Sequence, residues 1–140
     1  MPTDPTAPSN SADPFAGFEV LSVYSRADAL ADGVLVDLSD MARQAGFRIP
    51  LAVTEAVYRS YLDPSLELAN EGQSFQGRVW DLLQVLRFAA AVYPDRSEIR
   101  FKVLFVLTPG CPPEPVPLKA LCHPGDDGEP VLTVLLPSEN

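Results

Sequence analysis

The segment from Phe75 to Val92 constrains the fold of this chain more than any other part of the sequence. Its apolar residues recur at the spacing of one helix face: Val79, Leu82, Leu83, Leu86, Phe88, Ala89 and Ala90. The polar residues Arg78, Asp81, Gln84 and Arg87 fall on the other side. Residues 63–73 before it are turn-like, and Ser74 is a suitable N-cap because its hydroxyl can accept from the first-turn amides. The pattern predicts a long amphipathic helix that packs on another apolar element.

Apolar segments of strand length follow this helix. Ile99, Phe101, Val103, Phe105 and Leu107 alternate with mainly polar residues, which is typical of a half-buried strand. Two further apolar segments, LKALC at 118–122 and VLTVLLP at 131–137, are separated by loops rich in proline and glycine. Three such segments in succession predict an antiparallel meander.

Shorter elements are predicted near the start of the chain. The stretch FEVLSVYS at 18–25 is β-rich and of strand length. Ser25 and Asp28 have the spacing of a capping box, and the helix formers that follow continue to Gly33. Residues 33–37 are apolar and β-branched, so they favour a short strand or an extended connection.

Two more helices are predicted before residue 63. Ser39 is in position to cap a helix over residues 40–45, and Gly46 stands where a left-handed helix end favours glycine. Thr54 is in position to cap a helix over residues 55–62.

The order of these elements predicts an α+β fold, because strands and helices do not alternate regularly. We expect a C-terminal antiparallel β-meander packed against one long helix and several short helices. Residues 1–14, rich in Pro, Ser, Thr, Asp and Ala, predict a flexible N-terminal tail. Residues 15–140 are predicted to form a single domain.

The charge of the chain is negative and unevenly placed. The formal net charge is -9, and most of the excess of acids lies before residue 41 and after residue 107. Such a surface repels nucleic acid phosphates and attracts basic protein surfaces, although it also serves solubility. We therefore expect no direct nucleic acid binding.

Composition also bears on the compartment. The apolar stretch from Val79 to Val92 is interrupted by charges and is too short to span a bilayer, so we expect no membrane insertion. The N-terminus lacks the basic start and apolar core of a secretory signal, which favours a cytoplasmic location. In that compartment Cys111 and Cys122 are expected to be free thiols.

The stretch LCHPGDDGEPV at 121–131 gathers the single histidine, Cys122 and three acids. A metal or nucleophilic site on Cys111, Cys122 and His123 is one interpretation. Adjacent residues of an extended chain point to opposite faces, however, so the pair would need a local bend to act together. The glycines and acids match turn chemistry, which favours a hairpin loop. We predict no metal, no cofactor and no enzyme activity.

Two further surfaces are candidate binding sites. Gly72, Ser74, Gly77 and Arg78 lie at the start of the long helix, where free amides can bind an anion such as a nucleotide phosphate. Trp80 lies one residue away from the apolar line of the helix and could belong to a recognition surface, since tryptophan is common in binding hot spots. A plain helix entry and a core aromatic are the alternative interpretations.

The sequence also resembles a known family. The resemblance rests on the stretches SVYSRADALADGVLVDLSDMARQAGFRIPLAVTEAVY, GQSFQGRVWDLLQVLR and LKALCHPGDDGEPVLTVLLP, and it covers most of residues 20–137. It is to a family of small acidic proteins of unknown function carried by bacterial plasmids, phages and integrative elements. The family has no assigned catalytic residues. Accessory proteins of such elements are often inhibitors of host restriction or CRISPR machinery, which is what the resemblance implies here.

These observations predict a small acidic, non-enzymatic binding protein of a mobile genetic element, of the anti-CRISPR or antirestriction type. Its expected partner is a host protein or nucleoprotein complex with a basic surface. The predicted contact residues, besides Trp80, are Asp32, Asp37, Asp40, Asp126, Asp127 and Glu129. The alternative is a small-ligand or nucleotide-binding protein that uses the start of the long helix as a signal sponge. The oligomeric state stays open.

Overall fold

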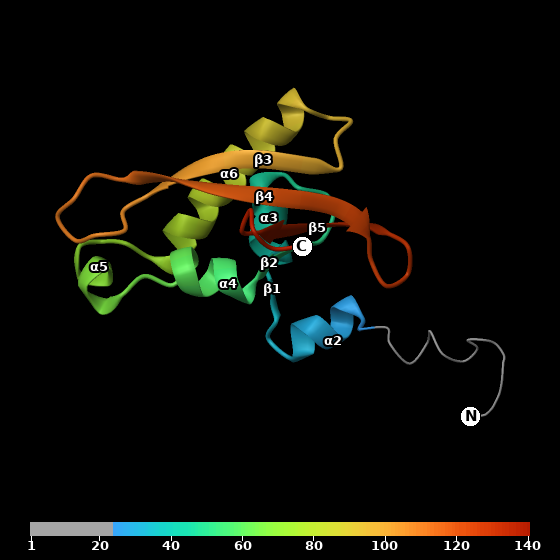
Figure 1. Cartoon of the computed structure of the whole chain (residues 1–140), viewed down its shortest axis with the longest axis horizontal. Helices are drawn as coiled ribbons and strands as arrows, with labels where there is room; N and C mark the ends of the chain where they lie inside the picture. Colours follow the sequence, from blue (N-terminus) through green and yellow to red (C-terminus); the bar gives the residue numbers. More distant parts are fainter. Residues whose placement is uncertain (1–23) are drawn as a thin grey trace, which may run out of the picture.

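A five-stranded sheet organises residues 24–140, the part of the chain that the computed structural model describes (Figure 1). Its strands, in spatial order, are β1 (Leu35–Asp37), β2 (Leu51–Thr54), β5 (Pro130–Leu135), β4 (Glu114–Pro124) and β3 (Glu98–Phe105). Neighbouring strands are antiparallel except β2 and β5, which are parallel. The predicted meander of the last three strands is confirmed.

Helical segments connect the first strands and precede the meander. They are α2 (Arg26–Ala31), α3 (Ser39–Ala45), α4 (Glu55–Val57), the π-helix η2 (Tyr58–Leu62), α5 (Leu66–Asn70) and α6 (Phe75–Val92). The long helix has the predicted bounds, and the Ser74 hydroxyl accepts from the Gly77 amide at 3.0 Å as a cap should. The α+β class is therefore confirmed.

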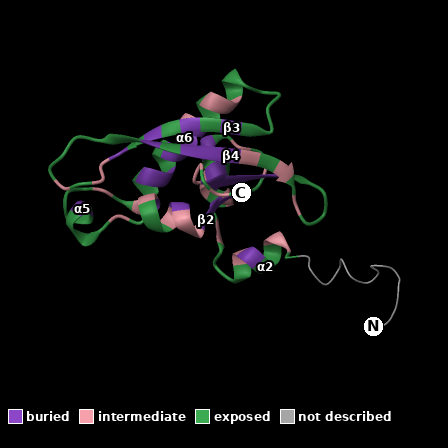
Figure 2. Cartoon of the chain, in the orientation of Figure 1, coloured by how far each residue is buried: buried purple, intermediate pink, exposed green. Residues whose placement is uncertain are grey.

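The core lies between α6 and one face of the sheet, which we call the inner face. Burial is concentrated in the strands and on one side of α6 (Figure 2). Strand β3 alternates buried and exposed residues along its whole length, with Phe101, Val103 and Phe105 on the inner face. The opposite face, the outer face, carries Lys119, Leu121 and His123 of β4 and Thr133 and Leu135 of β5, because side chains alternate along a strand.

Two side chains of α6 lie opposite to where the sequence pattern places them. Arg78, predicted on the polar side, is only 3% exposed, whereas Phe88, predicted on the apolar side, is 75% exposed. The guanidinium of Arg78 donates to the carbonyl oxygens of Tyr61 and Val106 and lies over the Phe105 ring. A buried arginine is possible here because backbone carbonyls accept from its Nη1 and Nη2, although Nε has no hydrogen-bond partner among the described residues. A pattern based on hydropathy does not detect such acceptors.

The start of α3 also differs from the prediction. Leu38, and not a side-chain cap, precedes the helix, and Ser39 is its first residue. The Ser39 hydroxyl donates to Asp37 at 2.6 Å and accepts from the Leu51 amide at 3.1 Å. Its role is to join the start of α3 to β2.

Three other segments differ from the prediction. Residues 51–54 form β2, which was not predicted, and α5 lies within residues predicted to be a turn, with Ser65 as its cap. Strand β4 begins at Glu114 and includes Pro115 and Pro117, because only one of its neighbours, β3, reaches that end of the strand. Residues 1–14, the predicted tail, and 18–23, most of the predicted first strand, lie outside the described residues.

The remaining helix signals are confirmed. Ser25 and Asp28 form the capping box of α2, and Thr54 caps α4 through the Val57 amide at 3.3 Å. Gly46 ends α3 with φ 104°, in the left-handed region. Among residues 24–140, no helix is long and apolar enough to cross a membrane.

Replacing Gly46 with alanine is expected to lower the free energy of unfolding by about 1–2 kcal/mol, because a side chain at positive φ is strained. The added Cβ would also lie 2.9 Å from Cζ of Arg87. Chemical denaturation measures the loss. The double variant Gly46→Ala/Arg87→Ala separates the two causes: if it recovers the whole loss, the close contact and not the backbone strain is responsible.

Candidate acidic binding site

The hairpin between β4 and β5 joins helix α2 through one carboxylate. Asp126 accepts hydrogen bonds from the backbone amides of Arg26 at 2.8 Å and Ala27 at 3.0 Å. These amides belong to the first turn of α2, which has no intrahelical partners for them. The contact brings together two segments about one hundred residues apart and fixes the hairpin loop beside the helix.

These amides hold the pKa of the Asp126 carboxyl below its ordinary value of 3.8, with the Arg26 amide as the largest cause. Because the pKa of Asp126 is lowered in the folded state, the contact stabilises the fold at pH values above the ordinary pKa of aspartate. This stabilisation is lost as the pH falls through the lowered pKa.

Amide hydrogen exchange at Arg26 and Ala27 is therefore expected to accelerate, beyond the intrinsic pH effect, as pH falls from about 5 to about 2. The reason is that a protonated Asp126 no longer holds the first turn of α2. NMR hydrogen exchange measures this, and Asp126→Asn is the control, since it should exchange fast at both pH values. Equal protection in the two proteins across that range would contradict the assigned contact.

The Arg26 side chain crosses from α2 to the outer face. Its Nη1 donates to the Thr133 hydroxyl at 2.9 Å and its Nη2 to the Leu132 carbonyl at 3.1 Å. Burial lowers the pKa of this guanidinium, while the negative charges of Asp37, Asp126 and Glu129 act in the opposite direction. These three acids are therefore close enough to Arg26 to share one electrostatic environment.

His123 continues the chain of hydrogen bonds. Its Nε2 lies 2.8 Å from the Thr133 hydroxyl and its Nδ1 lies 3.1 Å from the Pro124 carbonyl. Because a carbonyl can only accept, the proton of the neutral ring belongs on Nδ1, and the Thr133 hydroxyl donates to Nε2. Thr133 thus accepts from Arg26 and donates to His123, so each of these polar groups is satisfied.

Asp37 lies in the same row of the sheet. Asp37 of β1 is paired with Ala52 of β2, and Ala52 is paired with Thr133 of β5. Paired residues of neighbouring strands point to the same face, so Asp37 lies on the outer face, on the β1 side of Arg26.

Helix α2 adds two more acids. Asp28 belongs to the capping box, and Asp32, at the end of the helix, accepts from the Tyr24 hydroxyl at 2.7 Å. This hydrogen bond, together with the nearby acids, raises the pKa of Tyr24 from 10.0 to about 12. We call the group Asp28, Asp32, Asp37, Asp126, Asp127 and Glu129 the acidic end.

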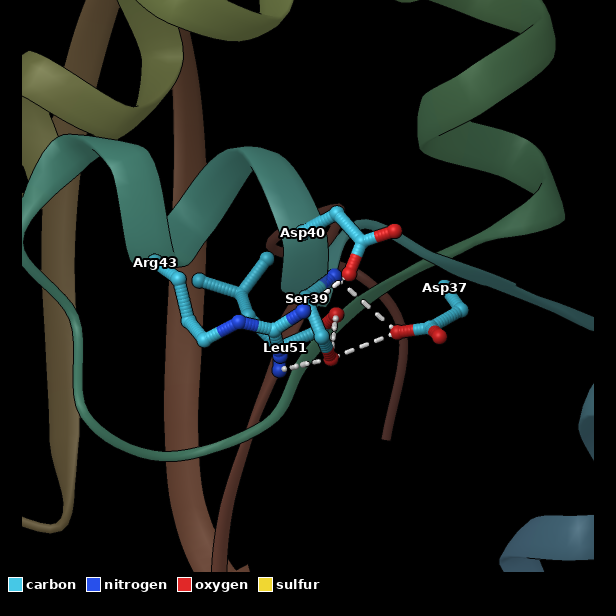
Figure 3. A network of polar contacts seen from close by, with 5 residues as sticks. All are labelled: Asp37, Ser39, Asp40, Arg43 and Leu51. Atoms are coloured by element: carbon cyan, nitrogen blue, oxygen red, sulfur yellow. Dashed lines mark hydrogen bonds and ion pairs between the residues drawn. The ribbon is translucent and has the colours of Figure 1, made fainter.

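Asp40 lies outside this group. It is on α3, where it forms an exposed ion pair with Arg43, as Figure 3 shows. The same figure shows Ser39 between Asp37 and Leu51, so Asp37 also has a structural role at the start of α3. Of the six acids predicted as contacts, the structure brings Asp37, Asp126 and Glu129 together at Arg26. Asp127 lies on the same loop and Asp32 at the end of α2, whereas Asp40 is apart from them and paired with a cation.

The hairpin interpretation of residues 121–131 is confirmed. The loop closes through the Gly125 amide, which donates to the Glu129 carbonyl at 2.6 Å, and Glu129 accepts from the Asp127 amide at 3.0 Å. Cys122 and His123 lie within β4, so their side chains face opposite sides of the sheet. Within residues 24–140, no three His, Cys, Asp or Glu residues are grouped as metal ligands, and Cys111 and Cys122 are exposed and unbridged.

The start of α6 has the geometry of an ordinary capped helix. Gly72 adopts φ 95° in the turn, Ser74 is the cap and Gly77 lies in the first turn. Arg78, predicted to assist an anion, instead directs its guanidinium to two backbone carbonyls of the interior. Its charge is therefore not presented at the surface beside the cap.

Trp80 is 40% exposed on α6. Because α6 covers the inner face, Trp80 and the outer-face residues Thr133 and His123 lie on opposite sides of the sheet. Trp80 and the acidic end are therefore two separate surfaces.

Comparison with known families gives one match. Residues 11–140 match a family described as a family of unknown function (DUF6573). The chain belongs to this family. No curated protein and no solved structure matches it.

For this DUF6573 chain, sequence reasoning did not single out Asp28, Arg26, Thr133 or Glu139 as members of a site. Arg26 and Thr133 are joined across the outer face, and Glu139 accepts from the Thr54 hydroxyl at 2.8 Å. The available signal was the capping box at Ser25 and Asp28, which located α2 but not its neighbour in space. Only the structure shows that the hairpin loop lies at the start of that helix.

Proposed function

We propose that this chain is a small binding protein whose acidic end docks on a basic protein surface. The observation that carries the proposal is that Asp37 of β1 and two carboxylates of the β4–β5 loop, Asp126 and Glu129, lie close enough to act on a single guanidinium, that of Arg26 in α2. Within the described residues none of the acids of this group forms an ion pair with a lysine or arginine side chain. A dense negative surface speeds association with a positive one and selects against other partners.

The partner class comes from the resemblance to accessory proteins of mobile elements. We propose a host defence complex, of the restriction or CRISPR type, whose basic nucleic-acid-binding face the acidic end occupies. A carboxylate surface competes with phosphate for the same arginine and lysine side chains. The chain would then act by displacing nucleic acid and would need no catalytic group of its own.

Neutralising part of the acidic end tests this proposal. The triple variant Asp32→Asn/Asp127→Asn/Glu129→Gln spares Asp126 and Asp37, whose carboxylates hold α2 and α3. It is expected to displace a fluorescent DNA duplex from a purified restriction or CRISPR nuclease complex about tenfold less effectively, because each rim charge contributes up to about 1 kcal/mol. Fluorescence anisotropy over a series of salt concentrations measures the displacement.

The matched control removes three exposed acids elsewhere, in Glu67→Gln/Asp81→Asn/Asp95→Asn. Both variants have the same net charge, so only the place of the charge differs. The control is expected to displace DNA as effectively as the parent protein does, and displacement by both is expected to weaken as the salt concentration rises. Equal displacement by the two variants would show that the acidic end is not the contact, and displacement independent of salt would exclude the electrostatic mechanism.

Nucleotide binding at the start of α6 remains the alternative proposal. It has less support, because the Arg78 guanidinium is committed to carbonyl oxygens of the interior. Calorimetry with a panel of nucleotides tests it, and an absence of heat would remove it.

A further inference from the structure

A pocket of about 550 Å³ lies between α2 and the outer face of the sheet. Its walls come from α2 and the residues beside it, from β1, and from β4 and β5. The chain after β5 closes one side of the pocket. There the Glu139 carboxylate accepts from the Thr54 hydroxyl and the Leu136 amide, and the Glu139 main-chain carbonyl accepts from Lys119. The pocket therefore has defined walls formed by segments that are distant in the sequence.

The walls are mainly apolar. Ala29, Val34, Leu35, Leu121 and Leu135 all line the space. Val34 is 45% exposed and Tyr24 is 55% exposed, so both side chains are accessible to a ligand. An aliphatic chain of three or four methylene groups would cover this surface.

Carboxylates also line the pocket. Asp126 and Glu139 line the pocket directly, and Asp32 is joined to Tyr24 at its edge. The two backbone amides on Asp126 keep its carboxyl ionised, because they lower its pKa. The charge around the opening therefore favours a cation.

Arg26 shows that the polar part of the pocket accepts a guanidinium. Its head group is bound by the Thr133 hydroxyl and the Leu132 carbonyl, and its position is thereby fixed. It is the one lysine or arginine among the described lining residues, whereas two carboxylates line the pocket, Asp126 of the loop and Glu139. Among the charged side chains that line the pocket, two carboxylates therefore face one guanidinium, while Lys119 outside the lining donates to the main-chain carbonyl of Glu139.

We propose that this pocket receives an arginine side chain from a basic segment of the partner protein. The methylene stem would pack on Val34, Leu35 and Leu135, and the guanidinium would meet the carboxylates of Asp126 and Glu139. Arginine combines an apolar stem with a planar donor group that matches carboxylates, which is the combination that the walls and the opening offer. This inference rests on the proposed function and names the chemistry by which the acidic end recognises its partner.

Peptide binding followed by NMR tests the proposal. The probe is a capped peptide, Gly-Leu-Arg-Leu-Gly, titrated into the ¹⁵N-labelled full chain. Amide signals of Val34, Leu121 and Thr133 are expected to shift, and the same peptide with citrulline in place of arginine is expected to bind about tenfold more weakly, because it keeps the shape and loses the charge. Equal affinity for the two peptides, or shifts confined to other faces, would overturn the proposal.

Two variants at the pocket complete the test. Val34→Phe fills the pocket without changing charge, and Tyr24→Ala removes an exposed wall and carries little risk to folding. Both are expected to weaken binding of the arginine peptide several-fold while leaving the rest of the spectrum unchanged. If both bind it as the parent does, the pocket is not the site.

The outcomes separate this inference from the proposed function. If the acidic triple variant weakens DNA displacement and the two pocket variants leave both displacement and peptide binding intact, the acidic end is the contact and the pocket proposal is wrong. If the triple variant displaces DNA as its matched control does, the proposed function is wrong, whatever the peptide does.

Discussion

Replacing Arg78 with alanine is expected to lower the free energy of unfolding by about 3–5 kcal/mol. The Arg78 guanidinium bridges the Tyr61 carbonyl, at the end of η2, and the Val106 carbonyl, just after β3. Its loss leaves these part-buried acceptors without their side-chain donor and opens a space over the Phe105 ring. Urea denaturation followed by circular dichroism measures the change.

Two further variants show whether the bridge is the cause. Arg78→Lys keeps a charge but has one compact head group, so it is expected to recover only part of the loss. Arg59→Ala removes an arginine from the exposed pair with Glu55 and is expected to change stability by about 0.5 kcal/mol or less. If Arg78→Ala costs no more than Arg59→Ala, the guanidinium is solvated and not a structural bridge.

Replacing Leu86 with alanine is expected to lower the free energy of unfolding by about 2–5 kcal/mol, because it leaves a cavity in the core. Leu86 is fully buried between α6 and the inner face. Thermal and urea denaturation measure the loss.

Phe88→Ala is the matched control on the same helix. Phe88 is 75% exposed, so its truncation is expected to change stability by about 0.5 kcal/mol or less although the side chain is larger. A greater loss for Phe88→Ala than for Leu86→Ala would mean that α6 is rotated relative to the structure described above.

The parts of the fold that could be predicted from the sequence are those specified by neighbouring residues. A cap acts within three residues, so Ser25, Thr54 and Ser74 were identified correctly, and the alternation of β3 was visible in eight successive positions. The sides of α6 on which Arg78 and Phe88 lie were predicted wrongly. A hydropathy pattern does not detect that the carbonyls of Tyr61 and Val106 accept hydrogen bonds from a buried guanidinium.

The parts that could not be predicted depend on contacts far apart in the chain. Strand β2 has four residues, all buried, so it shows no alternation, and its parallel partner β5 is the last described strand. The acidic site has the same origin. Asp126 and Asp127 were recognised as turn residues, but nothing local indicates that their loop caps α2 and so collects acids from two ends of the sequence.

The position of β5 in the sheet has a consequence for how the protein is made. This strand lies between β2 and β4, although the ribosome synthesises it after every other described strand. Until it emerges, β1 and β2 have no neighbour that connects them to the hairpin of β3 and β4, and their apolar residues have no complete sheet to join. We therefore expect the sheet to form only after synthesis of residue 135, with nascent chains protease-sensitive up to that point and a single cooperative folding step afterwards.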